Sequence, residues 1–311
     1  MADPLTSSEL RALRRIGRAW DRFFFETADP SPLGLIRIAT GLLLLWSLGW
    51  LGTDLRGYLG SQGWIDQASL QQARHSDWVW SLWNFVPDRM LSLAWAGSML
   101  VLLLFTLGVA GKVMAPLAWA IAVSTTRRNP FILHGFDQIL TLWTFYLAVS
   151  LASSQAFSVD RWLARRKGGS ETPKPTISAN LGLRMIQINL AIVYGAAGVA
   201  KLRGMSWWDG SALIKTLGNA EFRPFDLTWI LGTATGVYLL NLLTHLSMWT
   251  EVLYPVFVWK KATRPIVLVA VVMMHAGIAL VMGLTEFSLA MLAGNLAFVV
   301  WPTKDKSSGS A

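Results

Sequence analysis

Long apolar segments are the feature that most restricts how this chain can fold. A helix that crosses a membrane requires about 20 consecutive, mostly apolar residues. About eight segments meet this requirement, and they lie roughly at 33–52, 90–110, 112–126, 131–152, 178–200, 229–259, 264–283 and 285–301. The third is short and the sixth is long, so about seven to nine spans are compatible with the pattern. We therefore expect an all-α fold, a polytopic integral membrane helix bundle of about eight transmembrane helices with no separate soluble domain.

The composition agrees with a membrane protein. Hydrophobic residues make up 53% of the 311 residues and charged residues only 14%, which is more apolar than a soluble domain needs for its core. Many of the 17 Trp residues lie near segment ends, where an interfacial aromatic belt is expected. The absence of cysteine excludes disulfides and thiolate chemistry, and no metal-ligand spacing is present, so no metal is expected. The net charge of +9 then reflects membrane topology, and no nucleic-acid partner is expected.

The distribution of Lys and Arg predicts the orientation, because cytoplasmic loops are enriched in them. With both termini in the cytoplasm, sixteen basic residues fall on the inner side and nine on the outer side. The spans then belong to one transmembrane domain at 29–302. The inner side holds a flexible linker at 155–177 and a disordered tail at 303–311, and the outer side holds loops at 53–89 and 202–228.

Residues 1–28 are predicted to form an amphipathic helix. Leu13, Ile16 and Trp20 recur at spacings of three and four, and arginines fill the other face. Such a helix suits the cytoplasmic membrane surface, where anionic lipids attract arginine. A plain basic flank before the first span predicts the same orientation.

Lys201 is the intramembrane residue that most directly suggests chemistry. It closes an Ala- and Gly-rich helix end in the segment YGAAGVAKLRGMSWWDG at 194–210. Long cationic side chains at helix ends commonly extend to the membrane surface, which is the ordinary explanation. The small residues at 195–198, however, allow another helix to approach and to place Lys201 between helices. Desolvation there disfavours the charged form, and a neutral amine is a general base.

Other intramembrane polar residues need partners, because an unpaired polar group in a membrane is costly. Glu251, deep in the sixth segment, requires a partner or a proton. Asp137 is expected to pair with Arg127 or Arg128, and Arg37 to extend toward the inner surface. A lone intramembrane histidine such as His275 is more often a hydrogen-bonded core residue than a ligand.

The segment around Lys201 resembles a known family signature. Matching positions are Tyr194, Ala197, Gly198, Lys201, Trp207 and Gly210. The signature is that of the vitamin K-dependent gamma-carboxylase membrane domain and its bacterial relatives, the HTTM (horizontally transferred transmembrane) proteins. Further weak matches, in the same order along the chain, are Arg37, the outer segment 58–65, Arg128, Asn129, Pro130, Gly135, Asp137, and the pair His275 and Phe287.

The resemblance implies a fold, a place and an activity. It implies a protein of the bacterial inner (cytoplasmic) membrane in which Lys201 deprotonates a vitamin K-like hydroquinone at the outer face. The hydroquinone then consumes oxygen to form a stronger base that removes a substrate proton. The implied catalytic residues are Lys201 and His134, and the implied quinone or substrate pocket contains Tyr194, Gly198, Trp207, Trp208, Asp137, Asn129 and His275.

Two departures from the carboxylase leave the activity open. Pro130 stands where the carboxylase has an active-site histidine, and the nearest histidine here is His134. The carboxylase also continues into a large lumenal domain, so the expected partners here are membrane lipids and a separately encoded peptide or protein substrate. The alternative is a non-enzymatic membrane scaffold, maturation factor or transporter, whose buried charges serve packing or ion movement.

Overall fold

The computed structural model describes residues 7–66, 81–129, 134–170, 172–219 and 224–299, together with 69, 72, 132 and 222. Within these residues the fold is all-α, and no strand is present. Strand-like backbone pairing among the described residues is limited to one isolated β-bridge. In it, the backbones of Ala28 and Thr176 exchange hydrogen bonds of 3.1 and 3.0 Å. The all-α part of the predicted fold is therefore confirmed for the described chain.

Nine longer helices account for most of the described residues. They are α1 (Ser7–Phe25), α2 (Ser31–Leu51), α5 (Leu91–Leu107), α6 (Gly111–Arg128), α7 (Gly135–Ser150), α9 (Ile177–Leu202), α12 (Ala234–Phe257), α13 (Arg264–Met282) and α14 (Thr285–Asn295). Shorter elements connect them: α3 (Leu55–Leu59), η2 (Leu82–Phe85), η3 (Asp88–Met90), α8 (Val159–Arg166), α10 (Met205–Trp208), α11 (Ala212–Gly218), η7 (Thr228–Gly232) and η8 (Leu296–Phe298).

Each predicted apolar segment coincides with one helix between α2 and α14. Four stretches in the described chain are long and apolar enough to cross a membrane by length and composition, namely Ser31–Leu59, Asp88–Leu107, Ile177–Leu202 and Arg264–Met282. The protein is therefore a helical membrane protein with several spans. The linker predicted at 155–177 contains helix α8, and the tail at 303–311 lies outside the described residues.

Local sequence signals determine several helix ends. Thr176 and Thr233 accept hydrogen bonds from the backbone N–H groups of Ala179 and Gly236, which caps the starts of α9 and α12. Helices α5 and α13 end at Gly108 and Gly283, whose φ angles of 70° and 72° favour glycine. The helix ends predicted from apolar length therefore also carry capping residues.

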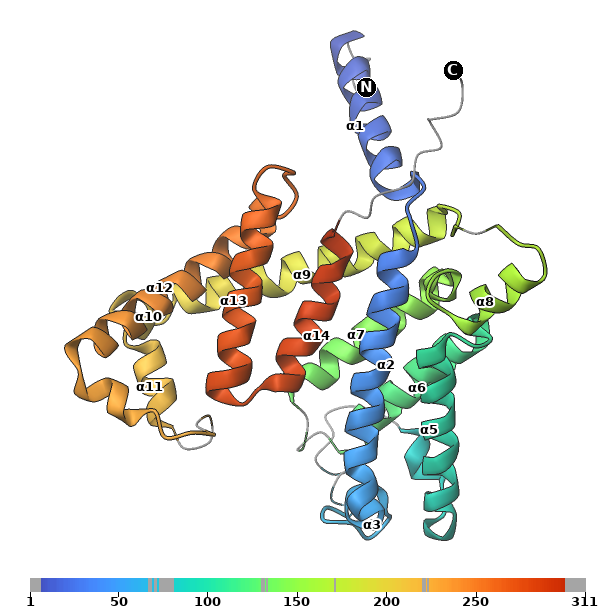
Figure 1. The fold of residues 1–311 in the computed structure, drawn as a ribbon, viewed down its shortest axis with the longest axis horizontal. Coiled ribbons are helices and arrows are strands. Elements are labelled where there is room, and N and C mark those ends of the chain that lie inside the picture. The colour runs from blue at the N-terminus through green and yellow to red at the C-terminus, as the bar shows by residue number, and fades with distance from the viewer. Residues whose placement is uncertain are drawn as a thin grey trace, which may run out of the picture.

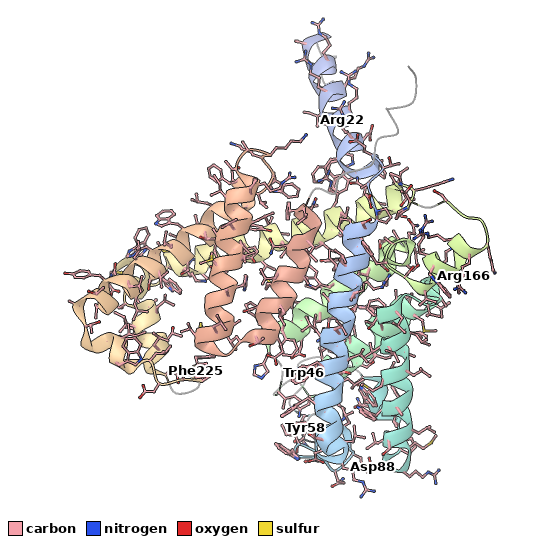
Figure 2. All side chains as sticks on the ribbon, viewed as in Figure 1. Arg22, Trp46, Tyr58, Asp88, Arg166 and Phe225 are labelled. Carbon is pink, nitrogen blue, oxygen red and sulfur yellow. The ribbon has the colours of Figure 1, made fainter. Side chains whose placement is uncertain are left out.

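Helix α9 crosses the bundle at an angle to α2 and α14, and it packs along α12 (Figure 1). It begins near the start of α2, passes α14 and α13, and ends beside α10 and α12. We call the end of the bundle with α1 and α8 the α1 face, and the end with α3, η3 and the α13–α14 turn the α3 face. Arg22 and Arg166 lie toward the α1 face, and Tyr58 and Asp88 toward the α3 face (Figure 2).

Helix α1 extends away from the bundle and is attached through its last turn (Figure 1). The Phe23 carbonyl accepts hydrogen bonds from Asn180 and Arg184 of α9, at 2.8 and 3.0 Å. Earlier on α1, Ile16 and Trp20 are 66% and 60% exposed, and the arginines are exposed too. The amphipathic helix is present, while its contact with lipid stays a prediction.

Arg37 is buried, and its guanidinium reaches toward the start of the predicted inner linker. Arg37 is 1% exposed. Its guanidinium donates to the carbonyls of Phe157 at 2.6 Å, Ala156 at 3.3 Å, Thr106 at 3.4 Å, and also Ser153. A planar cation with five N–H groups can satisfy several carbonyls at once, so Arg37 joins α2 to the end of α5 and to the segment 153–157 that follows α7.

Arg128 has the same role at the α3 face. It is 2% exposed and donates to the carbonyls of Leu59, at 3.1 Å, and Gly60. The expected ion pair between Asp137 and Arg127 or Arg128 is not among the described contacts; instead, the Asp137 carboxylate accepts from the His134 backbone at 2.9 Å. Arg128 thus holds the turn after α3 against the end of α6.

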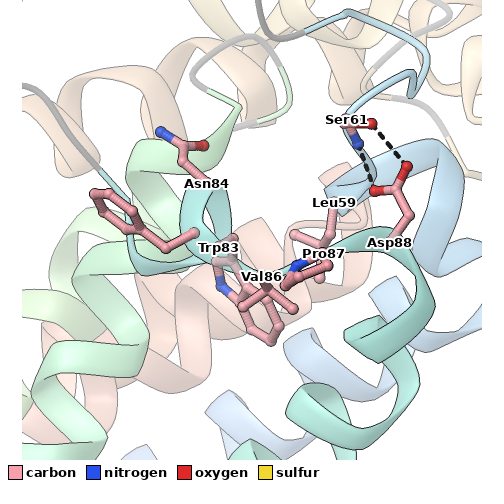
Figure 3. A pocket seen from close by; sticks show the side chains of 8 residues that line it. Leu59, Ser61, Trp83, Asn84, Val86, Pro87 and Asp88 are labelled. Atoms are coloured by element: carbon pink, nitrogen blue, oxygen red, sulfur yellow. Dashed lines mark hydrogen bonds between the residues drawn. The ribbon is translucent and has the colours of Figure 1, made fainter.

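A hollow of about 300 Å³ lies beside this turn, between Leu59 and the segment 83–88 (Figure 3). Ser61 closes one side, because its backbone N–H and hydroxyl donate to the two oxygens of Asp88, at 2.9 and 2.7 Å. The described parts of the segment 53–89 are therefore joined to each other by hydrogen bonds, and its place on the outer side stays a prediction.

Candidate functional site

The strongest electrostatic contact in the second half of the chain joins α9 to α12. The Lys201 ammonium donates a hydrogen bond to Glu251 and forms an ion pair with it. The two side chains are only 19% and 9% exposed, so solvent screens their interaction little. The Trp207 ring lies 4.8 Å from the Lys201 nitrogen, which adds a cation–π contact. Lys201 therefore points to a neighbouring helix instead of extending along the membrane surface.

Small residues on α9 make this contact possible. A Cβ atom on Gly198 would lie 2.7 Å from the backbone nitrogen of Val252, one residue after Glu251. A Cβ on Gly195 would lie 3.0 Å from the Pro255 ring. The helices are therefore too close for larger side chains at these positions, as expected for small residues at a helix interface in a membrane.

A second buried polar cluster lies two helical turns earlier on α9. The Tyr194 hydroxyl and His275 Nε2 are 2.8 Å apart. Asn295 donates to the Tyr194 hydroxyl at 3.2 Å and accepts from the Tyr254 hydroxyl at 2.8 Å. These four side chains, from α9, α12, α13 and α14, are at most 6% exposed. We call them the Tyr194 cluster.

The hydrogen bonds of the Tyr194 cluster fix the protonation of His275. The Asn295 amide donates to the Met291 carbonyl and to Tyr194, so among the described contacts His275 Nε2 is the acceptor left for the Tyr194 hydroxyl proton. Nε2 is then the acceptor, and a neutral imidazole carries its hydrogen on Nδ1. His275 Nδ1 is buried and has no hydrogen-bond partner in the described chain. The cluster therefore presents a buried N–H donor that lacks an acceptor.

The Lys201–Glu251 pair and the Tyr194 cluster belong to one region. Seven residues along α9 separate Tyr194 from Lys201, a rise of about 10 Å on one helix face. His275 packs against Phe287 with ring centroids 5.8 Å apart, which supplies an aromatic wall. We call this region the α9 site.

The remaining residues of the family signature form a clamp onto α12. The Trp208 and Asp209 carbonyls contact His245 and Asn241 of α12, at 3.2 and 2.9 Å. Gly210 has a φ of 76°, which favours glycine, and a Cβ there would overlap Asn241. Hydrogen bonds from Ser211 hold the pKa of the exposed Asp209 carboxyl below its usual range. The clamp fixes the end of α9 relative to α12, and so positions the Lys201 side chain.

His134, Asp137 and Asn129 lie at the start of α7 and the end of α6. His134 precedes the first turn of α7, where Asp137 caps its backbone N–H. Among the described residues, no hydrogen bond or ion pair links His134 or Asp137 to Lys201. A Cβ on Gly135 would lie 3.7 Å from Phe287, so the start of α7 approaches the far side of His275. One cavity shared by all these residues stays a prediction, and Pro130 lies outside the described residues.

Sequence reasoning identified Lys201, Tyr194 and His275 but missed three partners. Glu251 was recognised as needing a partner, yet Lys201 is 50 residues away in the chain. Tyr254 and Asn295 were not singled out, although both are polar groups in apolar segments. A helical wheel would have placed Tyr254 one turn after Glu251 on the same face.

The residues of the α9 site fit a ligand with oxygen atoms on an aromatic ring better than they fit a metal. The described chain contains no group of three or more His, Cys, Asp or Glu that could hold a metal. The unpartnered His275 Nδ1 can donate to a carbonyl or hydroxyl oxygen, and Lys201 provides a second cation or base. The neighbouring rings of Phe287 and Trp207 are suited to an aromatic ligand.

Comparison with known proteins agrees with this architecture. The chain is 28% identical over 212 residues to the uncharacterized protein YitO of Bacillus subtilis (strain 168), across 65% of this chain and 64% of that protein. The matched part thus spans slightly less than two thirds of the relative's length. No solved structure shows a significant match. The family model of the HTTM domain matches residues 25–301, and the chain therefore belongs to the HTTM-domain family.

Proposed function

We propose that this HTTM-domain protein is a membrane enzyme in which Lys201 acts as a general base on a quinol-type ligand. The observation that carries the proposal is the buried Lys201–Glu251 pair two helical turns from Tyr194, whose partner His275 has an unpartnered N–H. An ion pair used only for packing would not require that donor. A bound quinol would supply an ionisable hydroxyl and electrons for the reduction of oxygen.

Glu251 gives Lys201 a way to become a base. A lysine ammonium cannot accept a proton, but its hydrogen bond to Glu251 provides a path for the ammonium proton. Transfer along this bond leaves a neutral amine and a neutral carboxylic acid, and removes two charges from a low-dielectric site. The free amine can then take the proton of a ligand hydroxyl, which restores the ammonium.

His275 has a complementary role. Its Nδ1–H is held in place because Tyr194 occupies Nε2, and Tyr194 is in turn held by Asn295. A donor fixed in this way orients a ligand oxygen and stabilises negative charge that develops on it. The Tyr194 cluster therefore binds and orients, while Lys201 moves the proton.

The experiment compares lysine variants in nanodiscs. With a reduced naphthoquinol as the probe, we expect the wild-type protein to increase oxygen consumption over empty nanodiscs. We expect Lys201→Met and Lys201→Arg to lower this rate about 100-fold. Methionine has no amine, and a guanidinium stays protonated, so neither can serve as a base. Lys215→Arg, on exposed α11, is the matched control and should retain the rate.

A second measurement separates binding from catalysis. Quenching of tryptophan emission by the oxidised quinone should be similar for wild type and Lys201→Arg. If Lys201→Arg retains full oxygen consumption, the general-base role is wrong and a scaffold or transport role takes its place. If neither quenching nor oxygen consumption responds to the quinone in the wild-type protein, the quinol proposal fails as well.

We also propose that α2, α5, α6, α7, α9, α12, α13 and α14 all cross the bacterial inner membrane. This even number of spans leaves both termini, and the α1 face, in the cytoplasm. It is supported by the basic residues of α1 and α8 at that face (Figure 2). The chain has no cysteine, so Ser170→Cys and Lys215→Cys can each be labelled alone. An impermeant thiol reagent added to intact cells should label only Lys215→Cys, and equal labelling of both would contradict the orientation.

A further inference from the structure

His245 of α12 contacts two backbone carbonyls, one with each of its ring nitrogens. Nδ1 lies 2.9 Å from the carbonyl oxygen of Asn241, one turn earlier on α12. Nε2 lies 3.2 Å from the carbonyl oxygen of Trp208, at the end of α10. The ring is partly buried and belongs to the clamp that holds α10 against α12.

These two contacts depend on the protonation of the ring. A carbonyl oxygen accepts hydrogen bonds and cannot donate one. A neutral imidazole carries a single N–H, so it can donate to one carbonyl while its other nitrogen turns a lone pair toward the second. A protonated imidazole carries two N–H groups and can donate to both carbonyls. The contacts of His245 are therefore complete only when the ring is charged.

The charged groups around the clamp are compatible with a charged ring. The exposed Asp209 carboxyl lies close enough to His245 and to Lys215 of α11 that both positive charges favour its ionised form. The ionised carboxyl in turn favours the charged imidazole, although solvent weakens this effect at an exposed position. On α12 itself the charged residue is Glu251, which is six residues away and paired with Lys201. The two carbonyls are therefore the groups that decide what protonation of His245 does to the clamp.

From this geometry we infer that His245 is a pH-dependent latch, which holds the end of α10 against α12 when its ring is protonated. Loss of the proton removes one of the two hydrogen bonds. The bond to Asn241 lies within one helix, whereas the longer contact with Trp208 joins two elements and is the one released. The closed clamp is thus favoured at low pH and is lost as the pH rises, in the range of about pH 5 to 8 where histidine ordinarily titrates. The latch does not depend on the proposed quinol chemistry.

Two spin labels can test the latch directly, because the chain has no cysteine to remove. Met205→Cys on α10 and Tyr238→Cys on α12 replace side chains that are 77% and 76% exposed, so labels there should not disturb the fold. The distance between the labels is measured by electron paramagnetic resonance in nanodiscs without quinone, at about pH 5 and about pH 8. We expect a narrow distance distribution at the lower pH, and a broader and longer one at the higher pH.

Variants in the doubly labelled protein identify the group that titrates. His245→Gln keeps a donor but cannot change its charge, so its distance distribution should be the same at both pH values. Asp209→Asn removes the neighbouring carboxyl and should keep the pH response, because the imidazole and both carbonyls remain. His134→Gln is the matched control, since it removes a histidine at the start of α7 and should leave the response intact.

The inference is overturned if the wild-type distances are the same at both pH values, a comparison that requires no His245 variant to fold. It is also overturned if His245→Gln folds and keeps the full pH response, or if Asp209→Asn alone abolishes it, because another group would then control the clamp. None of these outcomes bears on the quinol proposal, which is tested by oxygen consumption.

Discussion

The two halves of the bundle bury polar side chains in different ways. In the first half, from α2 to α7, the buried cations Arg37 and Arg128 donate to backbone carbonyls at the ends of helices. In the second half, from α9 to α14, polar side chains bond to one another, as in the Lys201–Glu251 pair and the Tyr194 cluster. Carbonyls cannot change their protonation, whereas lysine, glutamate, tyrosine and histidine can. Buried polarity therefore joins helices in the first half, and can take part in proton transfer in the second.

This comparison predicts that the largest loss of stability follows a change in the first half. Arg37→Met would leave four carbonyls without this donor, three of them in buried contacts, and should lower the free energy of unfolding by about 3 kcal/mol or more. Lys201→Met leaves only one carboxylate, which can bind a proton, so its loss should be about 1–2 kcal/mol. Thermal unfolding followed by tryptophan emission measures both. Equal losses would contradict the distinction between the halves.

Arg37→Lys refines the same comparison. It keeps the positive charge but replaces a planar fork by a single ammonium, which cannot reach all the carbonyls at once. We expect a midpoint between those of wild type and Arg37→Met. A wild-type midpoint would show that charge alone stabilises this junction.

The second prediction concerns close contact between helices. Gly198→Ala places a methyl group against the backbone of Val252, so α9 and α12 must separate, at a cost of about 1–3 kcal/mol. The separation should also weaken the contact between Lys201 and Glu251, and lower the quinol-dependent rate. Gly97→Ala is the control in the first half, because nothing lies within 4 Å of its Cβ position. It should be neutral, or stabilising by up to about 1 kcal/mol.

The sequence predicted the parts of the fold that depend on local pattern. Apolar length located the eight longer helices from α2 to α14, and glycine spacing on α9 indicated a close helix neighbour. It did not predict the role of Arg37, because backbone carbonyls are present at every residue and carry no sequence signal. The partner of Glu251 was also missed, because their contact depends on how α9 crosses the bundle (Figure 1).

Contacts between residues far apart in the sequence also escaped prediction at the candidate site. Tyr194 and His275 were singled out by resemblance, but the protonation of His275 follows from Asn295, which is 101 residues from Tyr194 in the chain. Hydrogen-bond direction is a property of the assembled cluster and of none of its residues alone. The N–H donor of the α9 site therefore became visible only in three dimensions.

The smallest expected effect separates the two tyrosines of the second half. Tyr254→Phe removes a hydroxyl that bonds only to Asn295 Oδ1, and should lower stability by about 1 kcal/mol with little change in the quinol-dependent rate. Tyr194→Phe has a similar effect on stability but also frees His275 Nε2, so the imidazole can move its hydrogen away from Nδ1. Its rate should therefore fall further than that of Tyr254→Phe, and its quinone affinity should weaken. Equal rates in the two variants, at equal stability, would mean that His275 does not bind the ligand and that the Tyr194 cluster serves packing alone.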